Sequence, residues 1–162
     1  MNKYRPHLYI VPEDDAERQL VVGFVGHHGV NDSAVQSVPP VGGWLKARDA
    51  LLVEYVPKLK QSTDCHVLLA IDADGNGADR SRELVALVPA EVAQRVFVLS
   101  CAKDPEALRS ALGGRAYAAI GRELASQCDS GEGDLWEHQQ LRHNGEELAR
   151  LTAKVRPFLF GS

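Results

Sequence analysis

Two groups of acidic residues each follow an apolar run that is typical of a buried strand. The run at residues 7–11 leads through Pro12 to Glu13, Asp14 and Asp15, and the run at residues 66–71 leads to Asp72 and Asp74. Two carboxylates this close in an extended turn can bind one hard cation together, and Mg²⁺ prefers one or two carboxylates combined with water and substrate phosphates. The pattern therefore predicts metal-assisted phosphate chemistry. Taken singly, each of these residues is more typical of a helix cap or a solvated turn.

The elements that must position these residues alternate between strands and helices. Strands are predicted at residues 7–11, 34–41, 66–71 and 95–100, and the second belongs at a sheet edge because it contains Pro39 and Pro40. Helices are predicted over residues 15–25, 44–60, 79–87, 105–112, 117–126 and 145–155, and Pro57 should kink or shorten the second of them. This order predicts an α/β fold, with a mostly parallel, Rossmann-like sheet of about four strands flanked by helices. Because ligands gather beyond the carboxyl ends of parallel strands, the two acidic groups are candidates for one common site.

The length of 162 residues corresponds to one domain, here with a core at about residues 7–112 and a helical C-terminal extension at about 115–158. Cys65, Cys101 and Cys128 have no metal-like spacing and are expected to be reduced and buried. We also expect no signal peptide and no membrane span, and therefore a cytoplasmic protein. The net charge of −4 excludes a broad basic surface for nucleic acid, so contact with nucleic acid would need a metal or a partner.

The acidic residues and their order resemble the TOPRIM domain, which topoisomerases, bacterial primases and OLD-type nucleases share. In that family one strand ends in a glutamate and a later strand ends in an Asp-x-Asp pair. Here Tyr9-Ile10-Val11-Pro12-Glu13 matches the first motif, Leu68-Leu69-Ala70-Ile71-Asp72-Ala73-Asp74-Gly75 matches the second, and Glu17 matches a further acidic position. The resemblance covers about residues 7–112. The family usually has glycine directly after its glutamate, where this chain has Asp14.

The resemblance implies a small, stand-alone TOPRIM-like protein that acts as a Mg²⁺- or Mn²⁺-dependent nuclease or nuclease subunit on phosphodiester bonds. Glu13, Asp72 and Asp74 would hold the metal with Glu17, and Lys103 would join the first three as a catalytic residue beside a phosphate. The implied partners are nucleic acid, DNA rather than RNA, and an ATPase or further copies of the chain. The implied setting is a complex in bacterial defence or repair.

Two other functions fit the same residues. The first is a non-catalytic assembly or regulatory subunit that keeps the TOPRIM-like fold. The second is calcium binding, because Asp72, Asp74, Asn76, Gly77 and Glu83 match five positions of an EF-hand loop. Against calcium binding, Asp79 occupies a position that is usually apolar, and the segment before the loop is strand-like.

Two neighbouring features have two interpretations each. The backbone amides of Gly42 and Gly43 can approach an anion, or the two glycines can simply let the chain turn. Arg80 and Arg82 can contact phosphate or balance the charge of the aspartates. His138 and His143 lie too far apart in a polar region to predict a metal site.

Overall fold

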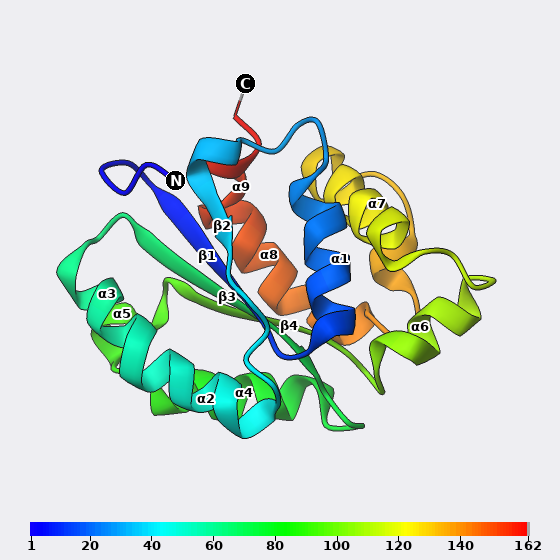
Figure 1. Ribbon diagram of the computed structural model, residues 1–162, viewed down its shortest axis with the longest axis horizontal. Coiled ribbons are helices and arrows are strands. Elements are labelled where there is room, and N and C mark those ends of the chain that lie inside the picture. Colours follow the sequence, from blue (N-terminus) through cyan, green and yellow to red (C-terminus); the bar gives the residue numbers. More distant parts are fainter. Residues whose placement is uncertain (162) are drawn as a thin grey trace.

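Four strands form one all-parallel sheet in the order β2-β1-β3-β4 (Figure 1). The structure is a computed structural model that describes residues 1–161. The strands are β1 (His7–Pro12), β2 (Val35–Ser37), β3 (Cys65–Asp72) and β4 (Val96–Cys101). β2 pairs with β1 alone and is therefore an edge strand, as predicted, although it has three residues rather than the eight expected. The predicted α/β class, with a parallel sheet, flanking helices and C-terminal helices, is confirmed.

Helices cover both faces of the sheet, which gives three layers (Figure 1). One face packs against α1 (Asp15–Val25), α6 (Pro105–Ala111), α7 (Tyr117–Ser130), α8 (Gly145–Lys154) and α9 (Arg156–Leu159). The other face packs against α2 (Trp44–Ala50), α3 (Val56–Gln61), α4 (Gly77–Leu87) and α5 (Ala90–Ala93). Successive strand residues point to opposite faces, so Leu68 and Leu69 of β3 enter different cores. Both faces are covered, which explains why the strands read as continuous apolar runs.

The helix predicted at residues 44–60 is interrupted by one π-helical turn at Leu51–Tyr55, between α2 and α3. Pro57 has no N–H to donate, and its ring would collide with the preceding turn of a regular helix. The wider turn accommodates it, and the N–H of Val56 donates to the carbonyl of Leu51, five residues earlier. Pro57 therefore distorts the helix, as predicted, but the distortion lies before the proline and the helical segment continues to Gln61.

The C-terminal helices are integral to the core rather than appended to it. Ile120, Leu124, Leu151 and Val155 are buried in the same apolar cluster as the strand residues. α7 extends to Ser130 and ends at Gly131, whose φ of +71° suits a left-handed helix end. The helix predicted over residues 117–126 therefore continues four residues further, to Ser130. Short 3₁₀ turns at Leu135–Glu137 and Arg142–Asn144, which were not predicted, carry the chain from α7 to α8.

Polar side chains from α8 and the turn before it form hydrogen bonds with the backbone along the outer edge of β4. The Asn144 amide accepts from the N–H of Ser100 (3.0 Å) and donates to the Ser100 carbonyl (2.8 Å). Glu147 accepts from the N–H of Val98 (3.1 Å), and Arg150 donates to the carbonyl of Val96 (3.1 Å). These side chains occupy the places where another strand would form its hydrogen bonds.

We expect Asn144→Ala to lower the free energy of unfolding by about 2 kcal/mol, because it leaves the buried N–H and carbonyl of Ser100 without their partner. Urea unfolding measures the change. Gln139→Ala, at an exposed position five residues earlier, is the control and should change stability by less than about 0.5 kcal/mol. Equal stabilities of the two variants would show that the Asn144 bonds contribute nothing net.

No helix among residues 1–161 is both long enough and apolar enough to cross a membrane. Cys65, Cys101 and Cys128 are free and buried, as expected from their spacing.

Candidate metal centre

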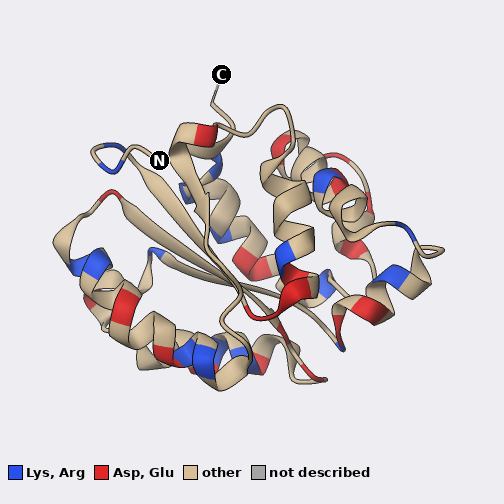
Figure 2. Ribbon diagram, viewed as in Figure 1, with Lys and Arg blue, Asp and Glu red and all other residues tan. Residues whose placement is uncertain are grey.

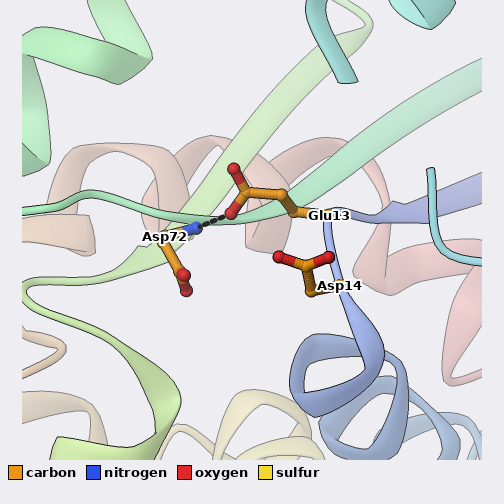
Figure 3. A group of neighbouring side chains, drawn as sticks. All are labelled: Glu13, Asp14 and Asp72. Atoms are coloured by element: carbon orange, nitrogen blue, oxygen red, sulfur yellow. Dashed lines mark hydrogen bonds between the residues drawn. The ribbon is translucent and has the colours of Figure 1, made fainter. Parts of the chain in front are cut away.

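Glu13 and Asp72 meet at the carboxyl end of the sheet, where β1 and β3 lie side by side. The N–H of Glu13 donates to the carbonyl of Ala70 (2.9 Å), and the N–H of Asp72 donates to Glu13 Oε2 (2.7 Å; Figure 3). The parallel register of the two strands thus brings together residues that are 59 positions apart in the sequence. Glu13 is buried, with 4% of its surface exposed. Figure 2 shows the acidic segment where the chain leaves β1 and enters α1.

A third carboxylate, that of Asp14, completes the cluster. Glu13, Asp14 and Asp72 each offer one oxygen, and these atoms lie within 4.8 Å of one another (Figure 3). Asp14 occupies the N-cap position of α1 but makes no capping hydrogen bond with its side chain. Asp72 Oδ1 is buried and has no hydrogen-bond partner among the described residues. An oxygen-only, negatively charged set of this kind suits a hard cation such as Mg²⁺.

The turn before α2 holds the backbone of Glu13. The amides of Gly42 and Gly43 donate to the Glu13 carbonyl at 2.8 and 3.3 Å. The φ angles of these residues are +90° and +133°, which residues with a side chain rarely adopt, so this turn requires glycine. Of the two interpretations of this glycine pair, the structure therefore favours a turn whose amides position a site residue over one whose amides bind an anion.

Glu17 lies in the first turn of α1, and its carboxyl is a neighbour of the Asp72 carboxyl. It is 3% exposed, and neither of its oxygens receives a hydrogen bond from the described residues. Burial, followed by the neighbouring carboxyl of Asp72, raises the pKa of Glu17 to about 9. At neutral pH Glu17 therefore keeps its proton.

Burial and neighbouring groups also shift the pKa values of Glu13 and Asp72. Burial raises the pKa of Glu13 to about 6, against the opposing effect of the hydrogen bond from the Asp72 N–H. Burial also raises the pKa of Asp72, while the neighbouring carboxyl of Glu17 acts in the opposite direction. A bound cation would reverse this trend, because it stabilises the ionised form of every carboxylate around it.

Asp74, predicted as a third ligand, lies outside the cluster. Its side chain is exposed and forms an ion pair with Arg80, with Oδ2 3.1 Å from the guanidinium. Arg80 also donates to the Asp72 carbonyl (2.8 Å), so it balances the charge of the aspartate loop. Lys103 is exposed just after β4, and its backbone N–H donates to the Gln140 side chain (2.9 Å).

The geometry around Asp72 differs from that of an EF-hand. A strand, β3, precedes the twelve residues from Asp72 to Glu83, whereas an EF-hand loop is flanked by two helices. From Gly77 onward the segment is already part of α4, and Asp79 and Glu83 are exposed on that helix. These two residues do not join the carboxylate cluster.

Asp14 belongs to the first acidic group in the sequence but is not among the predicted metal ligands. The structure brings its carboxylate into the cluster, at a position where the family usually has glycine. The position of Asp14 in the sequence could have identified it as a ligand, because it directly follows Glu13 at the carboxyl end of a buried strand. Asp15, the other candidate cap, instead pairs with Arg18 and Gln19 on the surface of α1.

A separate groove of about 520 Å³ runs between α4 and α8 along β4 and does not include the cluster. His143 lines it, and its Nε2 is 2.8 Å from Ser100 Oγ. The ring also packs against Gly77 so closely that a Cβ there would lie 3.0 Å from it. His143 therefore joins α4 to the turn before α8, and His138 bonds locally to the amide of Gln140.

Comparisons with protein-family models, with curated proteins and with solved structures gave no match.

Proposed function

We propose that this chain is a TOPRIM-like, Mg²⁺- or Mn²⁺-dependent nuclease or nuclease subunit that acts on phosphodiester bonds. The observation that carries the proposal is the meeting of Glu13, Asp14 and Asp72 at the carboxyl end of a parallel sheet, with a buried, unpartnered oxygen on Asp72. The resemblance of the two motifs to those of TOPRIM domains supports the same chemistry.

In this proposal Glu13, Asp14 and Asp72 hold the cation. A Mg²⁺ or Mn²⁺ ion held by these residues would supply charge neutralisation at a scissile phosphate and activation of a water nucleophile. Lys103, exposed beyond β4, is proposed to contact a phosphate, and Glu17 keeps the negative charge of the cluster low by retaining its proton. Because Glu17 is buried, it acts on Asp72 rather than on substrate.

The net charge of −4 limits the affinity of the isolated chain for nucleic acid, since Lys and Arg contacts to phosphate supply most non-specific binding. We therefore propose that it works within a complex, with an ATPase or with further copies of itself. DNA is the proposed substrate. A role in bacterial defence or repair follows from the resemblance to OLD-type systems.

The test is cleavage of plasmid and single-stranded DNA with Mg²⁺ or Mn²⁺, by the chain alone and with any protein that co-purifies from its native host. We expect Asp72→Asn to reduce cleavage by about 100-fold or more, because it removes a charged ligand of the cation. Asp79→Asn is the matched control, since Asp79 is an exposed carboxylate paired with Arg82. Urea unfolding checks that both variants are folded. Equal cleavage by Asp72→Asn and wild type would refute the proposal.

The non-catalytic subunit is the second candidate function. The ion pair of Asp74 with Arg80 favours it, because Asp74 thereby lies outside the carboxylate cluster. This candidate predicts no cleavage under any of these conditions, together with binding of the partner protein that Asp72→Asn leaves intact. Titration with Mn²⁺, observed by electron paramagnetic resonance, separates cation binding from cleavage, because it reports binding without requiring cleavage.

A further inference from the structure

Arg80, near the start of α4, is held far more firmly than its neighbour Arg82. Its side chain is 14% exposed, whereas that of Arg82 is 73% exposed. The guanidinium of Arg80 lies over the ring of Trp44, 4.3 Å from the ring centre. Trp44 is the first residue of α2 and directly follows the glycines that bond to Glu13. Stacking on an aromatic face fixes the plane of a guanidinium and so the direction of its N–H groups.

These N–H groups are aimed at the segment that carries Asp72. One nitrogen of Arg80 donates to the Asp72 carbonyl (2.8 Å) and to Asp74 Oδ2 (3.1 Å). Asp74 has a φ of +48°, a conformation that residues other than glycine rarely adopt, and its bond to Arg80 helps to hold it there.

The backbone of Asp72 is therefore held on both sides. Glu13 accepts from its N–H at 2.7 Å, and Arg80 donates to its carbonyl at 2.8 Å. With both peptide groups fixed, the direction in which the Asp72 side chain leaves the backbone is also fixed. That direction determines whether its carboxylate lies beside those of Glu13 and Asp14.

We propose that Arg80, backed by Trp44, is a positioning residue of the cation site and sets the orientation of Asp72. This inference rests on the proposed cation site at Glu13, Asp14 and Asp72. Residues that bond to metal ligands without touching the metal typically change metal affinity 10- to 100-fold when they are replaced.

Positioning and simple charge predict opposite results when Arg80 is removed. A guanidinium beside a cation site repels the cation, so if Arg80 acted only by its charge, Arg80→Met would strengthen cation binding. If Arg80 positions Asp72, the same substitution weakens binding even though a repelling charge has gone. The sign of the change therefore distinguishes the two roles.

The experiment is titration with Mn²⁺ at fixed ionic strength, followed by electron paramagnetic resonance. We expect Arg80→Met to weaken Mn²⁺ binding at least about tenfold. The control Arg82→Met removes the same charge from the same helix and should stay within about twofold of wild type. Trp44→Leu should weaken binding and Trp44→Phe, which keeps an aromatic face, should largely restore it. Unchanged or tighter binding by Arg80→Met would overturn the proposal.

A second measurement needs no metal. Hydrogen exchange at the Asp72 amide, observed by nuclear magnetic resonance, should be at least about tenfold faster in Arg80→Met than in wild type, while exchange at Leu69 in the middle of β3 stays unchanged. If wild type binds no Mn²⁺, the proposed function fails, yet this measurement still decides whether Arg80 holds Asp72. Unchanged exchange at Asp72 would overturn the positioning role.

Discussion

Gly121→Ala should lower the free energy of unfolding by about 3 kcal/mol or more and the Tm by about 10 °C. A Cβ at Gly121 of α7 would lie 1.9 Å from the carbonyl oxygen of Leu20 in α1, and one at Gly23 would lie 2.0 Å from that of Ala118. Both obstacles are backbone atoms, so no side chain can rotate away to make room. The two helices would have to move apart and open the apolar core between them.

Thermal and urea unfolding measure this change. Gly145→Ala is the control, because no atom lies within 4 Å of a Cβ placed at Gly145, at the start of α8. That variant should be neutral or more stable, since alanine favours a helix over glycine by about 1 kcal/mol. A stabilising effect of Gly121→Ala would show that α1 and α7 do not approach this closely.

Glu17→Gln should raise the free energy of unfolding at pH 8 by about 2–3 kcal/mol in the absence of divalent cations. The raised pKa of Glu17, about 9 against an ordinary 4.5, means that its proton stabilises the fold fully below about pH 4.5. This contribution is lost as the pH rises towards and through 9, with a slope of up to about 1.4 kcal/mol per pH unit. Glutamine has the same shape and no charge, so it removes both the slope and the cost of burying an ionised group.

Urea unfolding from pH 5 to pH 9 tests this expectation. The stability of wild type should fall across the range, and that of Glu17→Gln should fall much less. Glu83→Gln makes the same chemical change at an exposed position of α4 and should follow wild type within about 0.5 kcal/mol. Parallel curves for Glu17→Gln and wild type would mean that Glu17 is ionised in the folded protein throughout this range.

The sheet could be predicted because its signal is local. Each central strand is buried on both faces, so it appears in the sequence as an apolar run, and the run at residues 66–71 lies within β3. The packing of α1 on α7 had no such signal. A glycine inside a helix has no pattern that identifies its partner, and Gly121 meets the backbone of Leu20, about a hundred residues earlier in the chain.

The site was predicted in part for the same reason. Glu13 and Asp72 each end a strand, and parallel strands align their ends, so their meeting follows from the fold. The spacing of Asp74 and the resemblance to the Asp-x-Asp motif predict a position beside them. Asp74 instead pairs with Arg80, which lies over the ring of Trp44 in another helix, and contacts of that kind leave no trace in the local sequence.

The side chains that bond the outer edge of β4 also restrict how this chain can associate with other molecules. A sheet with an open edge can be extended by a strand from another protein, which is a common route to dimers and to aggregation. Here Asn144, Glu147 and Arg150 already occupy that edge. The opposite edge is β2, whose three residues offer few backbone groups for pairing. A larger assembly would therefore form through helix and loop surfaces, and its partner would not need to contribute a β-strand.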